Sequence, residues 1–128
     1  MRILLVLSFF TVFAVSCDDR KDVKTLRDQT MAIHDEAMKE MADMNRKGRN
    51  LKQELATLDT LPANQLRRAA MVATLAQMEK AEAGMMAWME QYQAPDDLPN
   101  AAAIKYLEEQ KRLMEENLAA MKVWKGEQ

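Results

Sequence analysis

Apolar residues recur at steps of three and four positions along three segments of this chain, and this spacing constrains its fold more than any other feature. Such steps place residues on one face of an α-helix that packs against partners. The first stripe starts at Val23 and continues through Leu26, Thr30, Ile33, Ala37, Met41, Met44, Gly48, Leu51, Leu55 and Leu58. The sequence therefore predicts one long helix over residues 22–59.

Two proline-containing turns separate this stripe from two further stripes. Pro62 follows Asp59-Thr60-Leu61, and Pro99 ends the segment 95–99. Asp and Thr cap helix starts, and proline is tolerated only in the first helical turn. The second stripe runs over residues 71–92 and the third over residues 104–121. The pattern predicts further helices over residues 62–93 and 100–125.

Short connections make consecutive helices antiparallel. We therefore predict an all-α fold, an antiparallel up-down-up three-helix bundle with coiled-coil-like packing, over residues 23–128. Gly48 lies on the first stripe, where the missing side chain would let another helix approach closely. This glycine lowers helix propensity by about 1 kcal/mol.

The first residues have the features of a targeting segment. Arg2 precedes an apolar run over residues 3–15, which is shorter than the about 20 residues that span a membrane. The run ends at Ala14-Val15-Ser16-Cys17, and charged residues follow at once. Small residues before a lone cysteine resemble the lipobox of bacterial lipoproteins, in which that cysteine carries the lipid.

This resemblance implies that residues 1–16 are cleaved as a lipoprotein-type signal peptide. Cys17 would then be lipidated and hold the protein to a membrane, and residues 17–22 would form a charged tether. The alternative is an ordinary signal peptide with an incidental free thiol at Cys17. An exported protein with one unpaired cysteine is unusual, which favours lipidation.

Composition excludes several classes of function. The formal net charge of −2 gives no basic face for nucleic acid. Cys17 is the only cysteine, so its lipidation leaves no thiolate for a disulfide, for catalysis or for a metal. The chain has no glycine-rich phosphate loop, no HExxH motif, one histidine, and no serine after Ser16. We therefore predict that the protein is not an enzyme.

The single histidine lies among methionines on the first predicted helix. At about 100° per residue, Met31, His34, Met38 and Met41 fall within an arc of roughly 80°. A second apolar strip of this kind is also what a helix with two neighbours needs for packing. If the first turn is centred near residue 61, His34 lies level with Trp88.

The same hairpin register brings a second methionine-rich patch, residues 85–89, to this height. Thioethers with an imidazole suit Cu(I) or Ag(I), and an indole adds cation–π attraction. The spacing of His34 and Met38 loosely resembles the His/Met pairs of periplasmic copper- and silver-binding proteins. Candidate ligands are His34, Met38, Met41, Met85, Met86 and Met89.

More ordinary roles stay open for these residues. His34 is also expected as a partly exposed residue that is hydrogen-bonded to Asp35 or Glu82. Glu82 is then a rim residue or half of an ion pair with His34. Trp88 and Tyr92 are candidates for partner contact if they are exposed, and otherwise the two tryptophans fill the bundle.

Three segments resemble a known family: IHDEAMKEM at residues 33–41, AGMMAWMEQY at 83–92 and YLEEQK at 106–111. They resemble small lipoproteins of Bacteroidetes-type bacteria that often carry the name "viral A-type inclusion protein", and the similarity spans nearly the whole chain. The resemblance implies an exported, lipid-anchored helical domain of the cell envelope and brings no established activity. Acidic residues after the lipidated cysteine resemble a signal for surface display. Asp18-Asp19 fits this in part, but Arg20-Lys21 interrupts the acidity.

We therefore expect a lipid-anchored protein of the outer membrane, on its periplasmic or its surface side. The leading functional hypothesis is a non-enzymatic helical module that acts through contacts with an envelope protein, without a cofactor. It predicts an exposed apolar strip. The alternative is a protein that binds Cu(I) or Ag(I), which predicts that the His34 nitrogen and at least two methionine sulfurs converge. A third possibility is a structural spacer with no ligand.

Overall fold

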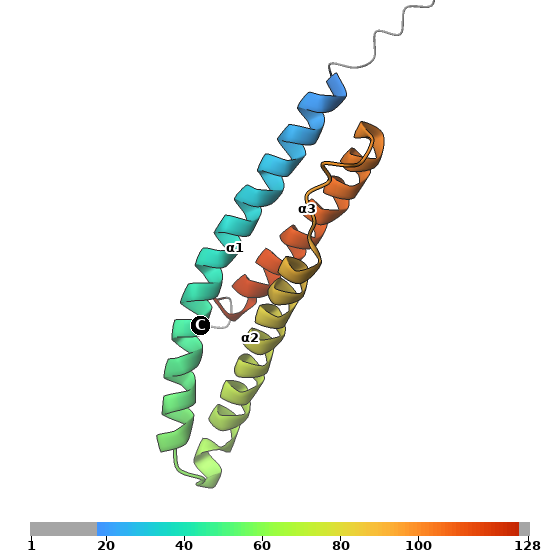
Figure 1. Cartoon of the computed structure of the whole chain (residues 1–128). Helices are drawn as coiled ribbons and strands as arrows, with labels where there is room; N and C mark the ends of the chain where they lie inside the picture. The colour runs from blue at the N-terminus through green and yellow to red at the C-terminus, as the bar shows by residue number, and fades with distance from the viewer. Residues whose placement is uncertain (1–17, 126–128) are drawn as a thin grey trace, which may run out of the picture.

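Residues 18–125 of the computed structural model are described, and they form three long helices with no strand among them (Figure 1). The helices are α1 (Asp18–Thr57), α2 (Gln65–Gln91) and α3 (Asn100–Lys122). Short 3-10 turns, η1 (Pro62–Asn64) and η2 (Val123–Lys125), precede α2 and follow α3. The predicted all-α three-helix bundle is confirmed.

The three helices alternate in direction and differ in length. Figure 1 shows α1 descending to a tight hairpin, α2 returning beside it, and α3 descending again along the upper part of α1. Because α3 has 23 residues and α1 has 40, the α1–α2 hairpin extends beyond the end of α3 (Figure 1). One end of the bundle is therefore built from three helices and the other from two.

The start of α1 differs from the prediction. The helix begins at Asp18 rather than near residue 22. The charged tether predicted for residues 17–22 stays a prediction. Arg20, Lys21 and Asp22 are exposed, although they lie within the helix. No proline or glycine interrupts the stretch, and a Lys24–Asp28 pair one turn apart supports the exposed helix. The predicted signal peptide and Cys17 lie outside the described residues.

Side chains close the hairpin between α1 and α2. The guanidinium of Arg68 donates to the carbonyl oxygens of Leu55 and Leu58, at 3.2 and 2.6 Å. These carbonyls are among the four that a helix leaves without a partner at its C-terminal end. Asp59 Oδ1 accepts from the Leu61 N–H at 3.1 Å and from Asn64 Nδ2 at 2.6 Å. The turn is therefore held by its own polar groups.

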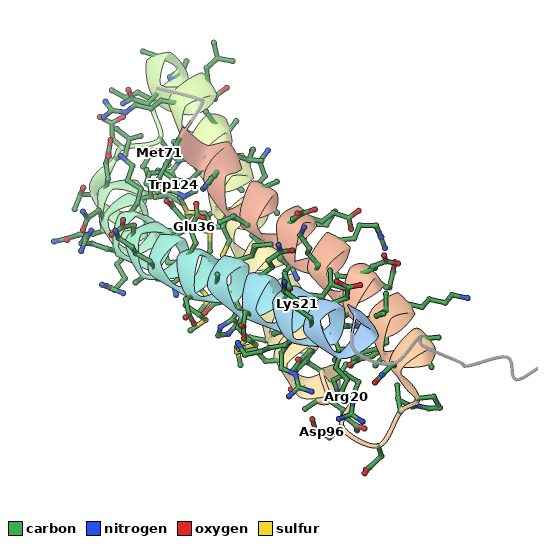
Figure 2. The ribbon with its side chains drawn as sticks, turned by 90° about the horizontal axis from the view of Figure 1, so that it is seen from above. Arg20, Lys21, Glu36, Met71, Asp96 and Trp124 are labelled. Atoms are coloured by element: carbon green, nitrogen blue, oxygen red, sulfur yellow. The ribbon has the colours of Figure 1, made fainter. Side chains whose placement is uncertain are left out.

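Methionine, leucine and alanine fill the core, as the sequence indicates. Figure 2 shows the side chains around the three helices, with Met71 and Trp124 at one end and Arg20, Lys21 and Asp96 at the other. The largest fully buried side chains are Met44, Met85, Leu107, Met114, Met121 and Thr30. The Thr30 hydroxyl is satisfied because it donates to the Leu26 carbonyl at 2.8 Å. None of the described helices is long and apolar enough to cross a membrane.

Two glycines mark close approaches to α2. A Cβ at Gly48 of α1 would lie 3.5 Å from Met78 Sδ and 3.8 Å from Leu75 Cδ2, both ordinary van der Waals distances. A Cβ at Gly84 of α2 would lie 2.8 Å from Asn117 Oδ1, too close without a shift of that side chain. Gly48 is therefore a site with room for a methyl group, and Gly84 is not.

We predict that Gly48→Ala stabilises the bundle by about 1 kcal/mol, because it adds helix propensity and fills ordinary contact space. The measurement is the free energy of unfolding in urea. Gly84→Ala is the matched control: it gains the same propensity but must displace Asn117, so its stabilisation is smaller or absent. Destabilisation by Gly48→Ala would contradict the described packing between α1 and α2.

Candidate functional site

The predicted histidine–methionine strip lies at the edge of the core, on the flank of α1 beside α2. Met31, His34, Met38 and Met41 are all half-buried, and the three methionines pack against the buried cluster. Residues three and four positions apart on a helix are surface neighbours. The strip is therefore continuous, and it is partly accessible to solvent.

An aromatic contact joins this strip to α2. The rings of His34 and Trp88 have centroids 5.6 Å apart and planes inclined by 32°. Trp88 also stacks on Tyr92 at 4.7 Å, and Tyr92 approaches Tyr106 of α3 at 6.3 Å. The buried Trp88 indole N–H meets no acceptor among the described residues, so packing alone holds the ring. The predicted level of His34 with Trp88 is confirmed by this contact.

His34 forms its hydrogen bond with Asp35 and not with Glu82, the other carboxylate that the sequence offered. Its Nδ1 lies 3.2 Å from Asp35 Oδ1, and 17% of the side chain is exposed. A proton on Nδ1, directed at the carboxylate, leaves the lone pair of Nε2 available. Glu82 instead accepts from Asn45 Nδ2 at 3.4 Å. The ion pair between His34 and Glu82 that the sequence left open is not formed.

The methionines of α2 divide between two environments. Met85 is fully buried and Met89 is half-buried against the core, whereas Met86 is 46% exposed. Met85 lies three residues before Trp88 and Met89 one residue after it. Of the predicted ligand set, Met38, Met41, Met85 and Met89 therefore belong to the core or pack against it, and His34 touches this core through Trp88. Met86 points away from the core.

The two aromatic residues predicted to contact a partner, Trp88 and Tyr92, pack largely within the bundle. Trp88 is only 6% exposed, as expected if it fills the bundle. Tyr92 is half-buried between Trp88 and Tyr106. A contact of Tyr92 with a partner stays a prediction.

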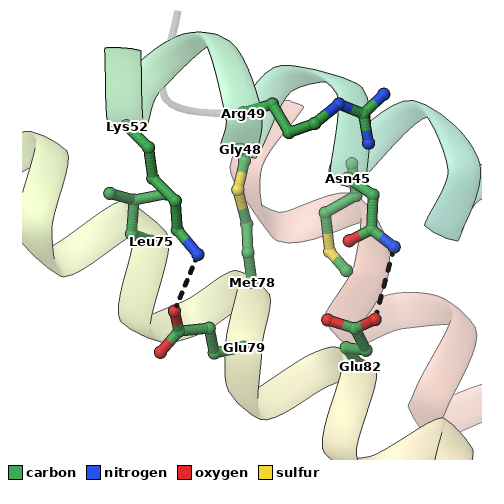
Figure 3. Close-up of a pocket in the computed structure, with 9 residues that line it drawn as sticks. Asn45, Gly48, Arg49, Lys52, Leu75, Met78, Glu79 and Glu82 are labelled. Carbon is green, nitrogen blue, oxygen red and sulfur yellow. Dashed lines mark hydrogen bonds and ion pairs between the residues drawn. The ribbon is translucent and has the colours of Figure 1, made fainter. Parts of the chain in front are cut away.

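Figure 3 shows a second feature between α1 and α2, a shallow pocket of about 170 Å³. Its apolar floor is formed by Met44, Gly48, Leu75 and Met78. The rim carries charges of both signs, and Lys52 Nζ lies 3.2 Å from Glu79 Oε1. Pockets for small molecules are usually about 300–1,000 Å³. This pocket is smaller, and no single charge dominates its rim.

The outer face of α2 is the feature that sequence reasoning missed. Apolar or small residues make up most of its exposed members: Leu66, Ala69, Val72, Ala73, Ala76, Ala83, Met86 and Ala87. The charged residues Glu79, Lys80 and Glu90 are exposed on the same face. The opposite side of α2 is apolar and is buried in the core. The signal was present as the alanines at positions 69, 76 and 83, one every seventh residue, but larger residues defined the stripes.

Among residues 18–125, no three histidine, cysteine or carboxylate side chains gather where they could hold a metal ion. The described part of the chain is thus an all-α bundle whose distinctive groups are a histidine–tryptophan contact, methionines and an exposed apolar helix face. No protein-family model, curated protein or solved structure matches the chain. Membership of the Bacteroidetes-type lipoproteins stays a prediction.

We predict that Tyr92 makes the bundle less stable at alkaline pH. Burial raises the pKa of the Tyr92 phenol above its ordinary value of 10, while Arg27 acts in the opposite direction. The folded state therefore favours the neutral phenol, so the contribution to stability is present below pH 10 and is lost as the pH rises through the folded pKa.

The measurement is the free energy of unfolding between about pH 9 and pH 11. Tyr92→Phe, which cannot ionise, should flatten the alkaline fall relative to the wild type. An equal fall in both proteins would exclude Tyr92 as its source.

Proposed function

We propose that this protein is a membrane-anchored, non-enzymatic helical module of the cell envelope that binds a partner protein through the outer face of α2. The lipobox-like Ala14-Val15-Ser16-Cys17 supports the anchor. The exposed apolar strip that this function requires is present on α2. Its lining residues come from one continuous helix, which gives it a rigid shape.

The observation that carries the proposal is the exposure of large apolar side chains along one helix. Leu66 is 86% exposed, Val72 53% and Met86 46%. Apolar surface removed from water contributes about 25 cal/mol per Å². A partner that covers this face therefore gains free energy from side chains that the bundle itself leaves in solvent.

The spacing of the small residues favours a helix as the partner. Alanines at 69, 76 and 83 form one row, and those at 73 and 87 lie beside it. A seven-residue repeat keeps a straight contact line with another helix, and alanine lets two backbones approach closely. Lys80 interrupts the second row and has no ion pair among the described residues. The partner helix should therefore carry small apolar residues and a carboxylate opposite Lys80.

The length and position of α2 suit this role. Twenty-seven residues give a helix of about 40 Å. With a lipid on Cys17, one residue before α1 begins, the bundle would project from the membrane and leave the outer face of α2 open along its length. A neighbouring envelope protein anchored beside it could then pack against this face.

We predict that a photo-crosslinker at Val72 captures the partner helix in intact cells, and that Ala76→Glu with Ala83→Glu abolishes the adduct. Two carboxylates on the contact line would be desolvated without partners. The matched control is Ala42→Glu with Ala56→Glu, two exposed alanines of α1. The control should keep the adduct.

Unfolding measurements should show both double variants within about 1 kcal/mol of the wild type, because all four sites are exposed. Persistence of the adduct in the Ala76/Ala83 variant, or equal loss in the control, would refute the proposed surface. A structural spacer with no ligand would give no specific adduct at any position on α2.

A further inference from the structure

The contact of His34 with Trp88 stands at the centre of a group of soft ligands. On α1, Met31 lies three residues before His34 and Met38 four residues after it, so both are its neighbours on the helix surface. On α2, Met85 and Met89 flank Trp88. The ring contact of 5.6 Å fixes how the two groups face each other. One imidazole and one indole are in contact, and four thioethers therefore lie within about one helical turn of this contact along their helices.

The imidazole is held in the way that metal-binding histidines are usually held. Its Nδ1 is 3.2 Å from the Asp35 carboxylate. In metal sites the other ring nitrogen commonly donates to such a carboxylate, which fixes the ring and raises the basicity of the ligating nitrogen. The Asp35 contact therefore presents Nε2 as the free donor atom.

The methionine thioethers can be reached by an ion from solvent, and their side chains can rotate toward it. Met31, Met38 and Met89 are half-buried, and 17% of the His34 side chain is exposed, so an ion can reach the site from solvent. Methionine is unbranched and flexible, so its sulfur can turn toward an ion without a shift of the backbone. Met85 is fully buried, so its thioether is the least accessible of the four.

We propose that His34 Nε2 and the sulfurs of Met38 and Met89 bind one soft monovalent cation, Cu(I) or Ag(I), with Met31 and Met85 as neighbouring thioethers and Trp88 over the ion. Neutral imidazole and thioether ligands prefer soft cations, whereas Mg²⁺ or Ca²⁺ require oxygen ligands. The indole face adds cation–π attraction, and the Asp35 carboxylate offsets the added positive charge. The site is separate from the outer face of α2 and does not depend on the proposed function.

Trp88 makes the binding directly measurable. The chain has two tryptophans, so Trp124→Phe leaves Trp88 as the only indole reporter. Cys17→Ser removes the only thiol, which would otherwise compete for the ion. The experiment titrates the full chain with both substitutions, purified in detergent, with Ag(I), and follows tryptophan fluorescence. We expect quenching that saturates at one ion per chain, with a dissociation constant below about 1 μM.

Two double variants of the same background separate ligation from packing. His34→Gln with Met38→Leu removes two proposed ligands, and we expect at least a tenfold weaker affinity. Met71→Leu with Met121→Leu removes two thioethers from the core elsewhere, and we expect an affinity within about threefold of the parent. Exchange of methionine for leucine nearly conserves volume, so both proteins should fold, which circular dichroism checks.

A second readout identifies the ligating atom. Nitrogen NMR of the histidine ring should show that Ag(I) shifts Nε2 much more than Nδ1. Zn(II) at the same concentration should give neither the quenching nor this shift. Absence of saturable Ag(I) quenching, equal loss of affinity in both double variants, or an equal response to Zn(II) would overturn the proposal. Cu(I) under anaerobic, reducing conditions should compete with Ag(I) for the single site.

Discussion

Thioether packing between the three helices is the interaction on which the rest of the structure depends. Four fully buried methionines, Met44, Met85, Met114 and Met121, occupy the centre, and Trp88 is the only aromatic residue of the buried cluster. Such side chains fill irregular space well but specify geometry weakly. Polar contacts therefore have an added role in fixing the register. Glu36 and Glu40 of α1 pair with Lys122 and Lys125 at the end of α3, and Arg68 closes the hairpin.

The same chemistry connects the core to its candidate functions. A methionine in a core and a methionine at a soft-metal site present the same sulfur, and only accessibility and a nitrogen donor distinguish them. At the level of His34 both conditions hold, whereas Met114 and Met121 are fully enclosed. The outer face of α2 shows the opposite case, because its small and apolar side chains are exposed and no other helix among residues 18–125 covers them.

The parts of the structure that were predictable from sequence follow from helix geometry. Steps of three and four with proline at the turns place each helix within about five residues of its observed ends. A constant rise per residue on both arms of a hairpin brings His34 level with Trp88. The helical start at Asp18 was missed because the helix ends were predicted from the apolar stripe, which begins only at Val23. The charged residues before it contribute nothing to that stripe. The choice of Asp35 over Glu82 depends on side-chain rotamers, on which periodicity carries no information.

The outer face of α2 was missed for a different reason. Alanine contributes little to the hydrophobic periodicity of a helix. The larger residues Met71, Leu75 and Met78 therefore determine which face is predicted to be buried, and a row of alanines on another face is not noticed. Only the structure shows that these larger residues are buried in the core and that the alanines stay exposed, with no other described helix covering them.

The early end of α3 gives the molecule a gradient of local stability. Beyond η2, each residue of the hairpin has one neighbouring helix instead of two, and Leu61 at its tip is 60% exposed. Segments with fewer buried contacts open at lower free energy than the rest of a domain. Backbone amides near the hairpin should therefore exchange with solvent sooner than those around Trp88. Apart from the exposed residues 20–22 at the start of α1, the tip of the hairpin is therefore the part of the bundle that opens at the lowest free energy.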